Sequence, residues 1–315
     1  MSRATALRGF CFAALLLAVL AFPAVFGRYP VKLLQEILIW GIYAMSLDLL
    51  MGHAGMVSFG HSAFFGVGGY VAALALTNLG AVGNGPLGAL LLPAAASALA
   101  ALVIGFFSIR VGGVYFIMLT LAFSQMFHAY AFQTGWLGAE DGITGVPRPT
   151  LLGLPTGEGW AFHVYVVTIA ALSTLFLWRV VRSPFGHVLA GIHENEERMA
   201  AIGYPVRRHK LLAFVLAGTL AGLAGSLYAQ FSGSITPDAF FWTTSGEALL
   251  MVIIGGAGTL GGAMLGAAAF ILLQSIVSTY TERWMLILGV TFVLFVLFAP
   301  GGIMGALRGR IGLRA

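Results

Sequence analysis

Long apolar runs separated by short polar segments dominate this chain, and their lengths predict membrane-spanning helices. A spanning helix needs about 20 predominantly apolar residues to cross a hydrocarbon core about 30 Å thick. The pattern predicts ten spans, with eight or nine as alternatives, at residues 9–27, 33–51, 56–77, 87–108, 112–133, 160–178, 211–232, 247–264, 265–281 and 284–304. The expected fold is therefore an all-α polytopic membrane protein, a single transmembrane domain over residues 1–315.

Two stretches of this pattern admit more than one division. Between Leu49 and Ile109, 61 residues contain no Asp, Glu, Lys or Arg, which is too long for one crossing, and a turn-rich segment at 78–86 divides them. The glycines of Gly255–Gly262 interrupt residues 247–281. That stretch predicts either two full helices or a broken, partly re-entrant element.

The first apolar run, 9–27, follows Arg3 and Arg8 and is compatible with a signal peptide or with a retained helix. The run is long for the apolar core of a signal peptide, and no clean small-x-small cleavage site follows it. We therefore expect a retained helix.

One hydrophilic island, Arg179–Lys210, interrupts the apolar pattern. It carries nine of the 27 formal charges of the chain within 32 residues. At about 2.5–3.5 kcal/mol for each charge at a bilayer centre, burying all of them would cost on the order of 20–30 kcal/mol. The island therefore lies outside the membrane, and it is long enough to form a contact surface for a partner protein.

Capping signals predict two short helices within the island. Ser183 is a suitable N-cap, with Pro184 at the first helical position. The run Glu194–Ile202 favours a helix, with acidic residues in its first turn, where the helix dipole prefers them. Gly203 is placed as a C-terminal cap, and Pro205 prevents continuation.

The distribution of charge predicts an orientation. With a cytoplasmic N-terminus, ten passes place the island on the inner side together with the C-terminal tail, which carries Arg308, Arg310 and Arg314. The connection 134–158, which has more acidic than basic residues, then faces outward. This arrangement agrees with the positive-inside rule.

Composition supports the membrane class and excludes several others. Hydrophobic residues make up 59% of the chain and charged residues 9%, whereas soluble domains are about one quarter charged. The isoelectric point of 9.6 does not indicate nucleic-acid binding, because the basic residues flank apolar runs. The single Cys11 excludes an intrachain disulfide. The 43 glycines favour closely packed helices.

Catalytic and metal-binding motifs are missing from the sequence. A nucleotide-binding P-loop needs Gly-Lys followed by Ser or Thr, but Lys32 and Lys210 are each followed by Leu. The sequence His193–Glu197 lacks the second histidine of a zinc-protease helix. We expect no catalytic residue and no metal ligand, and therefore a protein that is not itself an enzyme.

Polar residues inside the spans are the candidates for a translocation pathway. The segment Gly52–Tyr70 holds six glycines, a density that predicts either irregular backbone lining a cavity or close helix packing. The pathway candidates are Ser58, Gly60, His61, Thr120, Ser124, Gly255, Gly256 and Gly258. The acidic residues Glu36, Asp48 and Glu247 lie near expected span ends, and we interpret them as interfacial side chains that reach for water.

An ordered set of segments resembles the LivM-type permease subunits of branched-chain amino acid ABC importers. The matching segments are GHAGMVSFGHSAFFGVGGY, RVGGVYFIMLTLAFSQ, SPFGHVLAGIHENEERMAAIGYPVRRHKLLAF, AGLAGSLYA, SGEALLMVIIGGAGTLGGAMLGA and APGGIMG. They extend from about residue 33 to 305, and although no single segment is decisive, their order is specific. His187 and His193 depart from the family pattern, which commonly has arginine at both positions.

The resemblance implies that the island is a coupling element, which docks onto an ATP-binding subunit. The positions that carry this role over are Glu194, Asn195, Glu196, Glu197, Ala200, Ala201 and Gly203. The resemblance also implies a bacterial inner-membrane location and four partners: a LivH-type sister permease, two ATP-binding subunits and a periplasmic or extracellular substrate-binding protein. ATP and Mg²⁺ would be used by the partners, with no cofactor bound by this chain.

Branched-chain amino acids are the expected substrate. The same machinery importing urea, short amides, other amino acids or aromatic acids is an alternative that no residue excludes. An ion-coupled secondary transporter is the alternative from a different class. We expect the chain to contact membrane lipid and not to bind nucleic acid.

Overall fold

The computed structural model describes residues 19–79, 83–151, 154–155, 159–298 and 301–311. Most of the expected first span, together with Cys11, lies outside the described residues. The helices are α2 (Arg28–Asp48), α3 (His61–Asn78), α5 (Leu92–Ser108), α6 (Gly113–Gln133), α7 (Gly159–Val181), α8 (Pro184–Glu194), α9 (Glu196–Ala201), α10 (Val206–Ser232), α11 (Trp242–Gly255), α12 (Leu260–Tyr280), α13 (Trp284–Phe298) and α14 (Gly302–Ile311).

Short irregular elements connect these helices. Two π-helical segments, η1 (Leu49–His53) and η2 (Leu87–Leu91), continue α2 and precede α5. The 3₁₀ turns are η3 (Gly135–Leu137), η4 (Ala139–Asp141) and η5 (Pro237–Phe240), and the two-residue strands are β1 (Ile143–Thr144), β2 (Thr150–Leu151), β3 (Leu154–Pro155) and β4 (Ser234–Ile235). Strand β1 pairs antiparallel with β4, and β2 with β3.

The expected all-α architecture is confirmed. Within the described part of the chain, six helical stretches are long and apolar enough to cross a membrane: Arg28–His53, Leu87–Ser108, Gly113–Gln133, Trp160–Val181, Val206–Ser232 and Leu260–Tyr280. These coincide closely with six of the expected spans, because a run of about 20 apolar residues determines a helix without help from distant contacts.

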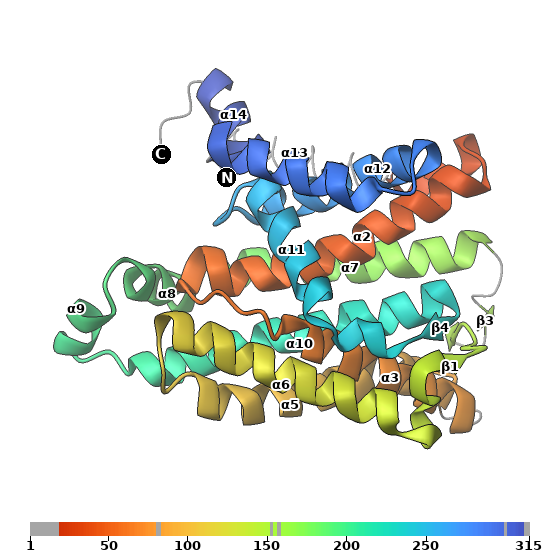
Figure 1. Cartoon of the computed structure of the whole chain (residues 1–315), viewed down its shortest axis with the longest axis horizontal. Helices are drawn as coiled ribbons and strands as arrows, with labels where there is room; N and C mark the ends of the chain where they lie inside the picture. The colour runs from red at the N-terminus through yellow and green to blue at the C-terminus, as the bar shows by residue number, and fades with distance from the viewer. Residues whose placement is uncertain (1–18, 80–82, 152–153, 156–158, 299–300, 312–315) are drawn as a thin grey trace.

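The long helices lie roughly side by side, and the bundle has two distinct ends (Figure 1). Helices α8 and α9 project from one end, whereas β1, β3 and β4 lie at the other. We call these the α8–α9 end and the strand end. Helices α2 and α10 pack against each other and against α3, so their facing surfaces form much of the buried core.

The island forms the two expected helices, α8 and α9. Ser183 caps α8, since its Oγ accepts from the Gly186 N–H at 3.4 Å. The expected helix Glu194–Ile202 is wrong at its start: α8 continues through Glu194, and Asn195 begins α9 by accepting the Arg198 N–H at 2.8 Å. An asparagine side chain competes well for this capping position, and it divides the helix there.

Two of the apolar segments that were expected to span the membrane are broken, and each contains a stretch of irregular backbone. Residues 54–60 lead from the α8–α9 end to α3, which begins at His61 instead of the expected residue 56. Residues 234–241 lead from the strand end to α11, a helix of 14 residues that is about 21 Å long. A helix of that length does not cross about 30 Å of hydrocarbon alone.

Residues 247–281 therefore form a broken element and not two full helices. Of its two parts, only α12 is long enough to cross a membrane, whereas α11 is short. The expected boundary at 264/265 is wrong, because the chain turns at 256–259 and α12 begins at Leu260. Gly256 and Gly258 have φ values of 107° and 77°, in the left-handed region that side chains with a Cβ disfavour. These two glycines thus locate the turn.

The close-packing interpretation of the glycine-rich segment applies to its helical part. A Cβ placed on Gly68 would lie 2.0 Å from the carbonyl oxygen of Gly222, and one on Gly225 would lie 1.9 Å from that of Phe65. Helices α3 and α10 therefore approach each other backbone to backbone, as small residues permit in membrane proteins.

We expect Gly68→Ala to destabilise the bundle by about 1–3 kcal/mol or more, because the added methyl group meets a backbone atom that cannot rotate away. Gly289→Ala, in α13, is the matched control, since no described atom lies within 4 Å of its Cβ position. Thermal unfolding of the purified protein in detergent measures both. Equal melting temperatures for the two variants would contradict this packing.

Candidate functional site

The N-termini of α3 and α11 meet in the interior of the bundle and form a polar cluster. The Ser62 N–H donates to Ser245 Oγ at 2.7 Å, which joins the first turn of one helix to the first turn of the other. Ser62 Oγ and Ser124 Oγ both donate to the carbonyl oxygen of Phe240, at 3.0 Å and 2.6 Å. We call Ser62, Ser124, Phe240 and Ser245 the central junction.

The central junction lies about halfway across the bundle. Ser124 is close to the middle of the 21-residue α6, and its side chain is fully buried. Gly60 packs directly on α6, since a Cβ there would lie 2.1 Å from the Thr120 carbonyl oxygen. His61 is hydrogen-bonded through Nε2 to Ser46 Oγ at 2.8 Å.

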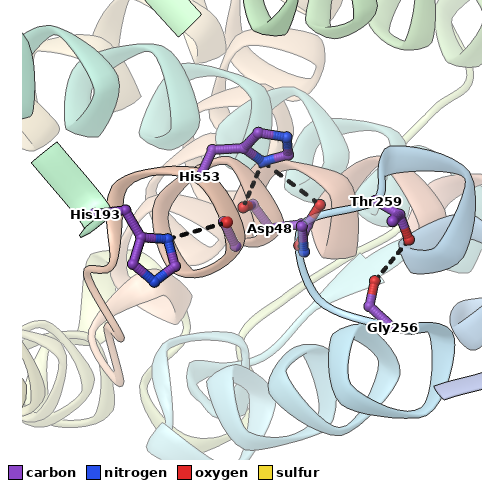
Figure 2. A network of polar contacts seen from close by, with 7 residues as sticks. Asp48, His53, His193, Gly256 and Thr259 are labelled. Carbon is purple, nitrogen blue, oxygen red and sulfur yellow. Dashed lines mark hydrogen bonds and ion pairs between the residues drawn. The ribbon is translucent and has the colours of Figure 1, made fainter. Parts of the chain in front are cut away.

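A second polar cluster joins the α8–α9 end of the bundle to the turn between α11 and α12 (Figure 2). Asp48 is fully buried, and its Oδ1 accepts the Gly258 N–H at 2.7 Å. His53 Nδ1 donates to the Asp48 backbone carbonyl at 3.3 Å and lies 3.8 Å from Asp48 Oδ2. We call Asp48, Gly52, His53 and Gly258 the inner junction.

The inner junction is in direct contact with the island. His193, in the last turn of α8, donates from Nδ1 to the Gly52 carbonyl oxygen at 3.2 Å (Figure 2). Gly52 in turn packs on Gly258, where an added Cβ would lie 2.2 Å from the Gly258 nitrogen. Helix α8 is therefore connected to η1, and through Gly52 to the α11–α12 turn, by direct contacts.

The island presents a partly apolar surface to the solvent. An open groove of about 760 Å³ is lined by Pro184, Phe185, His187, Val188, Gly191, Met199, Ile202, Tyr204 and His209. Ile202 is 64% exposed, and such an apolar side chain outside the bundle is available for a partner. Lys210 forms an ion pair with Glu196 and holds α9 beside α10.

The candidate pathway residues fall into two groups. Gly60, His61, Thr120 and Ser124 lie at or beside the central junction, and Ser58 is buried on the segment that leads to it. Gly255, Gly256 and Gly258 lie at the α11–α12 turn by the inner junction. The structure does not bring the two groups into one cluster. Their role in translocation stays a prediction.

Sequence reasoning missed several residues of both junctions. Ser62 neighbours the candidate His61, but Phe240 and Ser245 give no local signal, because their contacts depend on where α3 and α11 begin. The interpretation of Asp48 as an interfacial side chain is wrong. It reaches no water and instead binds a backbone amide 210 residues away.

Comparison with known proteins places this architecture in a family. The chain matches the family described as branched-chain amino acid transport system / permease component over residues 29–297. It is 28% identical to the high-affinity branched-chain amino acid transport system permease protein LivM of Salmonella typhimurium, over 96% of this chain and 76% of that protein. It is 27% identical to the probable LivM of Methanocaldococcus jannaschii, over 83% and 86%.

A shorter similarity extends to a second type of permease. The permease protein LivH of Escherichia coli is 28% identical over 45% of this chain and 46% of its own length. No solved structure matches. Because the family match covers most of the chain, including both junctions and the island, this protein belongs to the branched-chain amino acid transport system permease family.

Proposed function

We propose that this chain is a transmembrane permease subunit of an ABC importer that carries leucine, isoleucine and valine across the bacterial inner membrane. The observation that carries the proposal is the contact between the island and the inner junction. A two-helix projection outside the bundle is hydrogen-bonded directly to the ends of spanning elements. The names of the related LivM proteins support the substrate class.

Ten crossings with both termini in the cytoplasm are compatible with this arrangement. The ten crossings in this proposal are residues 9–27, the six long helices, α13, and the two broken crossings that contain α3 and α11. The α8–α9 end is then cytoplasmic, and the strand end, which includes the acidic turn at η4, faces outward. Alternation of direction along the chain supports this topology, because α7 ends and α10 begins at the island.

Coupling in this proposal begins at α8 and α9. Two ATP-binding subunits close around ATP and Mg²⁺. Helices α8 and α9 are docked on the surface of one of these subunits and move with it. His193 passes the movement to Gly52, and the Asp48 carboxylate passes it to Gly258. Residues Glu194–Gly203 are the docking surface, so their exposure to solvent in the isolated chain agrees with a role in binding.

The remaining partners occupy the other surfaces. A sister permease of the LivH type packs on an apolar helix face, such as the one formed on α6 by Val114, Tyr115, Met118 and Met126, which are all exposed. The partial similarity of this chain to LivH supports a pair of related subunits. A substrate-binding protein delivers the amino acid at the strand end.

Reconstituted uptake tests the function directly. Proteoliposomes that contain the complete importer and its binding protein are expected to accumulate radiolabelled L-leucine only when ATP is supplied. The ATP must be on the side of the membrane where the ATP-binding subunits lie. Affinity profiling of the binding protein against leucine, urea, short amides and aromatic acids identifies the substrate. Leucine uptake by this chain alone, driven by an ion gradient, would instead indicate a secondary transporter.

Gly203→Val is expected to uncouple transport while leaving membrane insertion intact. Gly203 follows the end of α9 and has a φ of 91°, where a β-branched residue is strained by about 1–2 kcal/mol, and no described atom lies within 4 Å of its Cβ position to clash with it. Gly203→Asn is the matched control, because asparagine tolerates left-handed backbone. Substrate-stimulated ATPase activity is the measurement. Normal stimulation in the valine variant would count against docking at this helix.

Asp48→Leu is expected to reduce ATP-driven leucine uptake at least about tenfold, because the Gly258 N–H loses its acceptor at a cost of about 1–3 kcal/mol. Asp48→Asn keeps an oxygen at the position of Oδ1 and is expected to retain most of the uptake. Uptake rates of the two variants, compared at equal amounts of assembled importer, decide the outcome. Equal rates would show that this hydrogen bond does not transmit the movement.

A further inference from the structure

Two helix N-termini face each other in the centre of the bundle. Helix α3 begins at His61 and α11 at Trp242, and the two are joined where the Ser62 N–H meets Ser245 Oγ. Each N-terminus carries a partial charge of about +0.5. Two like ends that lie close together repel each other, so a negative group between them is stabilised; the α11 end is partly open, since Trp242 is 42% exposed. Among the described residues, neither N-cap, Gly60 or Phe241, supplies a capping side chain.

An unpartnered hydroxyl points to the same place. Tyr43 is fully buried, and its hydroxyl lies near Ser245 but makes no hydrogen bond of regular geometry to any residue that the structure describes. Its ring stacks on His61, the first residue of α3, with centroids 5.3 Å apart. Such a hydroxyl is also found at Tyr165, but only the Tyr43 hydroxyl belongs to a side chain that packs on the first residue of α3, so it is available to a group bound between the two helix ends.

An acidic side chain and an apolar surface lie beside this hydroxyl. Glu247 lies in the second turn of α11, two residues after Ser245, on a helix that packs against α2, which carries Tyr43. Trp40 stacks on Phe65 with centroids 5.6 Å apart, and Phe65 lies 5.5 Å from Tyr228. We call Trp40, Phe65 and Tyr228 the aromatic wall.

We propose that the central junction is a transient binding site for the zwitterionic end of an α-amino acid. The α-carboxylate lies between the N-termini of α3 and α11 and accepts from the Tyr43 hydroxyl. The α-ammonium faces Glu247, and the apolar side chain packs on the aromatic wall. The proposal rests on the proposed function, because it assigns a site inside this chain to the substrate of that transport.

Helix N-termini, hydroxyls and a carboxylate together match the charge pattern of such a ligand. A helix N-terminus favours an anion through its free N–H groups and its dipole, and broken helices in transporters place these groups where substrate passes. Glu247 at the same depth would repel a simple carboxylic acid but attract an ammonium group.

The site is closed in this structure, since Ser62, Ser124 and Tyr43 are all fully buried. Binding therefore requires α3 and α11 to separate, and the segments 54–60 and 234–241 that precede them are the irregular elements that can move. Because α11 ends at Gly255, beside the inner junction, movement of the island acts on this helix. The site is thus exposed only during part of the transport cycle.

Substitutions that remove single polar groups test the site in the assembled importer. Tyr43→Phe is expected to lower ATP-driven uptake of L-leucine roughly tenfold to hundredfold, because one hydrogen bond to a charged group is lost. Tyr165→Phe is the matched control, since that hydroxyl is also buried without a partner among the described residues but lies on α7. It is expected to transport at the wild-type rate.

Selectivity separates a ligand contact from a structural role. Binding of tritiated L-leucine to the detergent-purified importer, with and without ATP, is competed with leucinamide, which lacks the carboxylate, and with 4-methylpentanoate, which lacks the ammonium. Wild type is expected to prefer leucine over both competitors. Tyr43→Phe should reduce only the ratio of the affinity for leucine to the affinity for leucinamide. Glu247→Gln should reduce only the ratio of the affinity for leucine to the affinity for 4-methylpentanoate.

The results distinguish this proposal from the proposed function. If wild-type importer lacks ATP-driven leucine uptake, the proposed function fails. If wild type transports leucine but Tyr43→Phe and Glu247→Gln transport it equally well, only the site is wrong. Variants that bind all three compounds more weakly by the same factor would show a structural role and would overturn the site.

Discussion

Hydrocarbon offers no hydrogen-bond partner, and the architecture depends on how the chain satisfies irregular backbone at that depth. Two apolar segments have irregular backbone, at residues 54–60 and 234–241, and in a bilayer such backbone must be covered by protein. The 3₁₀ turn η5 of the second segment packs on α3 and α6, and the helices that the two segments precede, α3 and α11, meet at the central junction. There the Phe240 carbonyl oxygen accepts two serine hydroxyls, which replace the helical hydrogen bond that the break removes.

Close helix packing makes this enclosure possible. Gly68 and Gly225 allow α3 and α10 to approach at backbone contact, and Gly60 allows the start of α3 to lie on Thr120 of α6. Larger residues would move α3 away and open the interior to lipid or water. The glycine content of the chain therefore supports two tasks at once: tight packing along the helices, and tight turns where they break.

The two junctions are mechanically linked through α11. This helix is only 14 residues long, with its N-terminus at the central junction and its C-terminus followed at once by the turn that Asp48 holds. A short rigid helix between two polar contacts transmits a displacement better than it absorbs one. The arrangement connects the projecting helices α8 and α9 to a polar cluster about halfway along the bundle.

The sequence by itself determined the features that depend on local chemistry. Apolar length predicted the six long helices, charge density predicted a segment apart from them, and Ser183 and Gly203 correctly marked where the first island helix begins and where the second ends. Each of these follows from a transfer free energy or from capping within a few residues. The family resemblance added the class of protein.

Only the tertiary structure decided where α3 and α11 begin and what their ends contact. Ser62 meets Ser245 across 183 residues of sequence, and Asp48 meets Gly258 across 210. No local pattern encodes such partners, because Ser or Asp near an apolar run is equally compatible with water, with its own helix or with a distant amide. Packing of the whole bundle selects among these choices, since a buried polar group must find a partner wherever the fold places it.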